Sequence, residues 1–163
     1  MKTLFLLRHA KSSWDDSTLT DFQRPLNKRG LEAAPLMGEA IRRHQFKIDL
    51  IVSSPAKRAV QTALLVKEAA KITGEIQFEA KIYEADTQTL RQIAANINDE
   101  IKSVLLVGHN PGFEHFLAFL TGASHAMPTA ALAVTDLRID EWNKLLAGAG
   151  ALRMLLRPKE LKR

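Results

Sequence analysis

The chain has 163 residues, a length typical of one domain, and we expect a single domain over residues 1–163. Hydrophobic residues make up 46% of the chain, which suits a globular protein with a substantial core, and the absence of cysteine excludes disulfides, thiolate metal sites and cysteine nucleophiles. The formal net charge is +5, and much of the excess lies in residues 157–163, which we interpret as a solvated basic surface.

The N-terminal apolar run, MKTLFLL, is too short for the core of a signal peptide. No segment approaches the ~20 apolar residues of a membrane span. We therefore expect a cytoplasmic protein with no membrane partner. The same run, TLFLL, predicts a first strand with both faces covered, because it is continuously apolar.

A helix is predicted over residues 27–44, with apolar residues spaced along one stripe. That stripe consists of Leu31, Ala34, Met37 and Ile41. Asn27 is the expected N-cap. Pro35 removes one backbone donor inside the helix, so we expect the helix to kink or to start late.

The run IDLIVSS predicts a second strand over residues 48–54. A helix should follow, with Ser54 as its N-cap and Pro55 at its first position, and should end by Gly74. A short strand is predicted over residues 76–83 and a helix over residues 87–98.

The segment SVLLVGHNPG, residues 103–112, reads as a strand, a turn and the start of a helix that continues to Gly122. The runs ALAVTDL and ALRMLL then predict an antiparallel pair at the sheet edge. Alternation of strands and helices predicts an α/β fold: a three-layer α/β/α sandwich whose sheet is mostly parallel, with an antiparallel edge strand.

Charged and titratable residues stand at the ends of three predicted strands. Arg8 and His9 end the first strand, Arg58 lies just after the second, and His109 ends the strand that begins at Ser103. The carboxyl ends of parallel strands meet at one edge of the sheet, where ligands bind in folds of this kind. Two arginines beside two histidines repel one another unless an anion joins them, so we expect a phosphate site.

A neutral histidine held among arginines can attack phosphorus as a nucleophile, because the nearby positive charge lowers its pKa. The arginines also stabilise the charge that develops on the phosphoryl oxygens. We therefore expect no metal and no other cofactor.

These motifs resemble those of the histidine phosphatase superfamily, also called phosphoglycerate mutase-like. The resemblance rests on LLRHA with Arg8 and His9, SSPAKRAVQT with Arg58, and VGHN with His109, in that order. The short chain and the phrases HAKSSW and DFQRPLNKRG look most like the small phosphohistidine phosphatase branch.

The resemblance implies a phosphoglycerate mutase-like fold and a phosphohistidine intermediate on His9 that water hydrolyses. Arg8, Arg58 and His109 would complete the phosphate pocket, and Glu84 in IYEAD is the positional candidate for the general acid. A solvated loop carboxylate is an equally good interpretation of Glu84. The implied substrate is a phosphohistidine on a protein, or else a small phosphorylated molecule.

The chain departs from the family pattern where Ala10 replaces the usual glycine and where Asp15 replaces an asparagine that touches phosphate in mutases. Arg24 and Asn27 are candidates for the pocket rim, with helix capping the simpler role for Asn27.

Three other functions fit the sequence less well. A phosphomutase needs water excluded from its phospho-enzyme, and the connections we expect to be short leave little material for a lid. A non-catalytic phosphate or phosphopeptide binder would be expected to lack His9. Nucleic-acid binding has only net charge in its favour.

Overall fold

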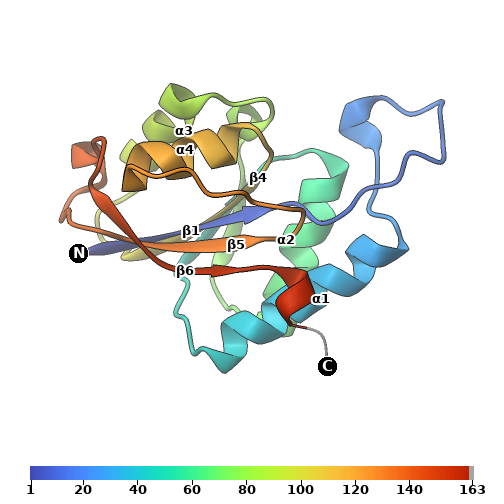
Figure 1. The fold of residues 1–163 in the computed structure, drawn as a ribbon, viewed down its shortest axis with the longest axis horizontal. Helices are drawn as coiled ribbons and strands as arrows, with labels where there is room; N and C mark the ends of the chain where they lie inside the picture. The colour runs from blue at the N-terminus through green and yellow to red at the C-terminus, as the bar shows by residue number, and fades with distance from the viewer. Residues whose placement is uncertain (162–163) are drawn as a thin grey trace.

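The computed structural model describes residues 1–161, which form a six-stranded sheet with helices on both faces (Figure 1). The strands are β1 (Lys2–Arg8), β2 (Leu50–Ser53), β3 (Glu75–Phe78), β4 (Ser103–Gly108), β5 (Leu132–Leu137) and β6 (Gly150–Leu156). The helices are α1 (Lys28–Arg43), α2 (Lys57–Ala70), α3 (Thr87–Ala95) and α4 (Gly112–Thr121), with short 3₁₀ turns at η1 (Asp21–Gln23), η2 (Ala80–Ile82), η3 (Trp142–Lys144) and η4 (Pro158–Glu160). The predicted three-layer α/β/α sandwich is confirmed.

The strand order is β3-β2-β4-β1-β5-β6. The first four of these strands are parallel, and β5 runs antiparallel to both β1 and β6. The predicted antiparallel pair, β5 and β6, therefore lies at the sheet edge. The strand that runs opposite to the other five is β5, and the outermost strand is β6. Because β2, β4 and β1 are parallel neighbours, their carboxyl ends lie side by side.

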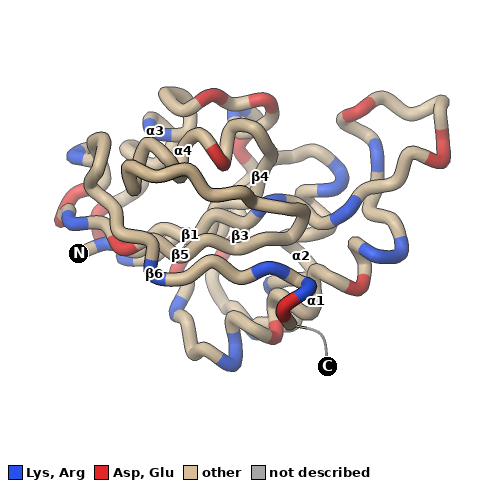
Figure 2. Tube along the Cα trace, in the orientation of Figure 1, with Lys and Arg blue, Asp and Glu red and all other residues tan. Residues whose placement is uncertain are grey.

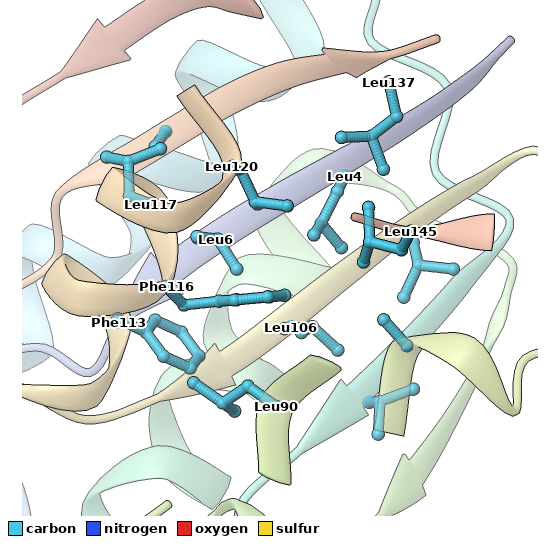
Figure 3. Close-up of a cluster of buried hydrophobic side chains, with 14 of the residues drawn as sticks. Leu4, Leu6, Leu90, Leu106, Phe113, Phe116, Leu117, Leu120, Leu137 and Leu145 are labelled. Atoms are coloured by element: carbon cyan, nitrogen blue, oxygen red, sulfur yellow. The ribbon is translucent and has the colours of Figure 1, made fainter. Parts of the chain in front are cut away.

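Strand β1 is apolar throughout because it separates two cores. Leu4 and Leu6 pack in the core beneath α3 and α4, whereas Phe5 and Leu7 pack in the core against α1 and α2. Figure 3 shows the first core, with side chains of β1, β4 and α4 meeting between the sheet and the helices. This alternation follows from the two-residue period of a strand, and the two covered faces hold the central strands rigidly.

Helix α1 begins where the sequence predicts, because the Asn27 side chain accepts a hydrogen bond from the N–H of Gly30. The predicted late start is wrong: α1 is a single helix with Pro35 in its interior. Pro35 removes only one donor from the helix, and the buried stripe that includes Met37 and Ile41 offsets that loss.

The predicted start of α2 is also wrong. The helix begins at Lys57, its N-cap is Ala56, and no side chain caps it. Ser54 instead extends β2, because its N–H donates to the carbonyl of Val107. Two neighbouring elements are shorter than predicted: β3 stops at Phe78 and α3 at Ala95.

None of the helices within residues 1–161 is both long and apolar enough to cross a membrane.

Candidate active site

The register of β1 and β4 places two histidines side by side. Arg8 lies opposite Gly108 in the parallel ladder, and the N–H of His9 donates to the carbonyl of Gly108 at 3.0 Å. The rings of His9 and His109 consequently lie 5.2 Å apart between centroids, and both residues are buried.

The two predicted arginines join this pair. The Nε of Arg58, on the first turn of α2, lies 3.4 Å from Nε2 of His9. Arg8 donates from Nη1 to the carbonyl of Met127, and its charge is close enough to lower the pKa of His9. The structure therefore brings together Arg8, His9, Arg58 and His109, as the sequence predicts.

Local contacts fix the segment that carries His9. The N–H of Ala10 donates to Oγ1 of Thr62, which in turn donates to the carbonyl of Arg58. Thr62 thus ties the end of β1 to the first turn of α2. On the other side, Gly30 lets α1 approach closely, since a Cβ there would lie 2.1 Å from the carbonyl oxygen of Lys11.

The hydrogen bonds of His9 define its protonation. Its Nδ1 lies 2.7 Å from the carbonyl oxygen of Ala10, which only accepts, so the ring proton sits on Nδ1 and Nε2 carries a lone pair. Burial and then the charges of Arg58 and Arg8 lower the pKa of His9 to about 4. The imidazole is therefore neutral at pH 7, with Nε2 beside a guanidinium.

His109 contacts a hydroxyl group rather than a carbonyl. Its Nε2 lies 2.8 Å from Oγ of Ser54, which also accepts a hydrogen bond from the N–H of Ala56. With its ring proton on Nδ1, His109 accepts from the Ser54 hydroxyl at Nε2 and can donate from Nδ1 to a bound anion. Burial and the neighbouring His9 lower the pKa of His109 to about 3.

Two buried nitrogens within residues 1–161 lack a hydrogen-bond partner: Nε of Arg8 and Nδ1 of His109. Unsatisfied buried donors are rare in proteins and commonly mark a site where a ligand binds. Both belong to the predicted phosphate pocket, and a phosphoryl oxygen is an acceptor that suits them.

Asp21 is the site residue that the sequence analysis missed. Its Oδ2 accepts from Nη2 of Arg58 at 3.0 Å and from the hydroxyl of Tyr83 at 2.5 Å, and its Oδ1 accepts from Nη2 of Arg24 at 3.1 Å. The Tyr83 hydroxyl and the two guanidinium groups hold the pKa of Asp21 at about 2. A permanently ionised carboxylate therefore lies against Arg58, beside the phosphate pocket.

Glu84, the predicted general acid, makes none of these hydrogen bonds. It is exposed, its backbone has a left-handed φ of 59°, and it makes no hydrogen bond to any residue within 1–161. Its neighbour Tyr83 is the residue that reaches the site, with its ring edge-on to His109 at 5.4 Å between centroids.

Arg24, a predicted rim residue, packs against Trp14 next to the site. The buried Arg24 donates to Oγ of Ser12 at 2.8 Å, and its guanidinium carbon lies 3.5 Å from the centroid of the Trp14 ring. Both residues belong to the segment 9–27, which extends away from the sheet before α1 (Figure 1). This segment carries Asp21 to Arg58 and so covers part of the site.

The arrangement can bind a tetrahedral anion and attack it. Arg8 and Arg58 supply charged donors, His109 supplies a neutral one, and Nε2 of His9 supplies an unprotonated nitrogen. Among the residues that the structure describes, no three His, Cys, Asp or Glu side chains form a group that would hold a metal ion.

Comparisons with known proteins point to one family and one fold. The profile of the histidine phosphatase superfamily (branch 1) matches residues 4–105. A solved structure from Agrobacterium tumefaciens, provisionally assigned as the phosphohistidine phosphatase SixA, is 33% identical, covers 96% of this chain and 98% of its own, and superposes with a TM-score of 0.82.

Two curated relatives match over nearly the whole chain. An uncharacterized chloroplast protein of Arabidopsis thaliana is 31% identical over 160 residues, covering 91% of this chain and 72% of its own. The phosphohistidine phosphatase SixA of Escherichia coli is 23% identical over 161 residues, covering 98% and 96% respectively.

Proposed function

This chain belongs to the histidine phosphatase superfamily, branch 1, and we propose that it is a phosphatase that works through a phosphohistidine intermediate on His9. The observation that carries the proposal is the state of His9. Its Nδ1 is anchored on the carbonyl of Ala10, and its unprotonated Nε2 faces Arg58. The pocket supports this reaction without a cofactor, because the arginines supply the positive charge that phosphoryl transfer requires.

In the first step, Nε2 of His9 forms a bond to phosphorus while the bond from phosphorus to the leaving group breaks. Arg8 and Arg58 bind the phosphoryl oxygens, and Nδ1 of His109 donates a further hydrogen bond to one of these oxygens. These donors stabilise the charge on the equatorial oxygens in the transition state. The leaving group keeps the electron pair of the broken bond and takes a proton from solvent.

In the second step, water attacks the phosphorus and the bond to Nε2 breaks, which releases orthophosphate and restores the neutral imidazole. The protons of that water leave with the orthophosphate. Asp21, whose pKa of about 2 makes it a weak base, acts as a positioning residue that holds Arg58 against the pocket. Tyr83 and Arg24 fix its orientation from two other directions.

The site supports phosphohistidine as the substrate because neither Asp21 nor Glu84 suits the role of general acid. Asp21, with a pKa of about 2, is ionised at neutral pH, and Glu84 is exposed and makes no hydrogen bond within residues 1–161. The imidazole of a phosphohistidine departs without the strong acid that an alkoxide requires. The names of the relatives from A. tumefaciens and E. coli agree with this class, and small phosphorylated metabolites are the second candidate.

Hydrolysis assays test the proposal directly. In the presence of EDTA, the protein should hydrolyse p-nitrophenyl phosphate and a phosphohistidine peptide, and His9→Ala should lower the rate by at least about a thousandfold because the nucleophile is gone. His115→Ala, on the exposed surface of α4, is the matched control and should retain activity. Full turnover by His9→Ala would reject His9 as the nucleophile.

A further inference from the structure

A cleft of about 700 Å³ lies beside the phosphate pocket. Its walls come from five separate parts of the chain: the end of β1 with Lys11, the first half of α1, Glu114 of α4, residues 126–129, and the junction of β6 with η4. Five cationic residues line it, and we call it the basic cleft: Arg8, Lys11, Arg29, Arg157 and Lys159.

The basic cleft has a net positive charge, because its cationic residues outnumber its carboxylates. Its two carboxylates are those of Glu32 and Glu114, so five cations less two anions leave a formal charge of +3. The carboxylate of Glu114 already accepts two hydrogen bonds, one from the N–H of Met127 and one from the side-chain amide of Asn110.

Three of the cations are free to meet a ligand. Lys11, Arg29 and Lys159 are exposed and form no ion pair with any residue from 1 to 161. Figure 2 shows basic segments at the end of β6 and at the start of α1 on the same side of the molecule. Uncompensated cations in a concave surface attract anionic partners and accelerate their association.

The basic cleft adjoins the phosphate pocket at Arg8. Arg8 lines the cleft, and it is also close enough to His9 and Arg58 for their charges to interact. The part of a substrate next to a phosphoryl group at His9 would therefore lie near the cleft.

From this geometry we propose that the basic cleft docks an acidic polypeptide segment that adjoins the phosphorylated residue of a protein substrate. The proposal rests on the proposed function, which it deepens by defining the class of substrate. The cations are distributed over several walls rather than gathered at one point, which matches acidic side chains spaced along a peptide. Between them lie apolar residues such as Leu36 and Met127, which suit the remaining side chains of such a segment.

Peptide binding tests the docking independently of catalysis. The probes are a fluorescein-labelled peptide rich in Asp and Glu and its twin with Asn and Gln, neither of them phosphorylated. At low salt the protein should bind the acidic peptide about tenfold more tightly than the amide twin, and added salt should weaken that preference.

Two double variants with the same change in net charge locate the effect. Arg29→Ala/Lys159→Ala removes two cations from the cleft and should lose most of the preference for the acidic peptide. Arg42→Ala/Arg43→Ala removes two cations from the last turn of α1, outside the cleft lining, and should keep it.

Equal affinity for the two peptides, or an equal loss in both double variants, would overturn the proposal. So would tighter binding of inorganic tripolyphosphate than of the acidic peptide, because that would assign the cleft to a small polyanion. If the protein showed no phosphatase activity, that result would instead count against the proposed function. The peptide-binding result would still test the docking proposal on its own.

Discussion

At the scale of single residues, Asp21 and Glu84 are the two carboxylates considered for the chemistry, and they differ in their contacts. Both side chains are exposed, but Asp21 contacts Arg58, Arg24 and Tyr83, whereas Glu84 makes no hydrogen bond within residues 1–161. A carboxylate that holds a phosphate-binding arginine affects the rate through that arginine. We therefore expect the larger effect from Asp21.

Matched amide substitutions test this expectation. Asp21→Asn should lower the hydrolysis rate of a phosphohistidine peptide by about a hundredfold, because Arg58 loses the charged partner that positions it in the pocket. Glu84→Gln should stay within about threefold of the unmodified protein. The reverse order of effects would restore Glu84 to the role that the sequence predicts.

The sequence reveals four site residues but not Asp21, for a physical reason. Arg8, His9 and His109 lie at the ends of strongly apolar strands, so their location follows from the sheet. Asp21 lies in the segment 9–27, which holds the 3₁₀ turn η1 and a single bridge between Ser12 and Leu26, and which has no periodic pattern that fixes its position. The one local signal was the Asp21–Arg24 spacing, which forms an ion pair.

At the scale of elements, Thr62 joins the strand that carries His9 to the helix that carries Arg58. It is fully buried, accepts from the N–H of Ala10 and donates to the carbonyl of Arg58. The distance between Nε2 of His9 and Arg58 therefore depends on the hydroxyl group of a third residue, Thr62.

Thr62→Val keeps the shape of the side chain and removes both hydrogen bonds. It should lower the free energy of unfolding by about 1–3 kcal/mol, since the buried N–H of Ala10 loses its partner and the Arg58 carbonyl keeps only its helical hydrogen bond. Its kcat should also fall in molecules that remain folded. Thr62→Ser retains the hydroxyl and should preserve most of the activity. Equal kcat for Thr62→Val and the unmodified protein would show that the contact does not position the site.

The order and type of the main helices and strands were predictable, because long apolar runs and amphipathic stripes determine them. The start of α2 was not. Ser54 and Pro55 form a good local start signal, but the Ser54 hydroxyl contacts His109 instead, and the helix begins later at Lys57. Tertiary contacts at the site override the local preference there.

For the whole molecule, the two buried histidines make stability depend on pH. Their pKa values are about 4 and about 3 in the folded protein, below the ordinary value of 6.5 that the unfolded chain has. Between about pH 4 and pH 6.5 the unfolded chain therefore binds more protons than the folded one. Stability should be complete above about pH 6.5 and should fall as the pH is lowered through this window.

Urea unfolding in phosphate-free buffer measures the effect. The free energy of unfolding should be lower at pH 5 than at pH 7, with a slope of at most about 2.7 kcal/mol per pH unit for two protons. His9→Gln/His109→Gln removes both groups and should flatten the dependence. A slope that is unchanged in this variant would assign it to other residues.

The most direct test of the central claim, that Nε2 of His9 receives the phosphoryl group, is to trap the intermediate. The protein is mixed with phosphorylated substrate, quenched in alkali within the first turnover, digested, and mapped by mass spectrometry. We predict an acid-labile, alkali-stable phosphate on the peptide that contains His9, absent from His9→Ala. Phosphate on the peptide that contains His109, or turnover with no phosphorylated peptide at any quench time, would contradict the account.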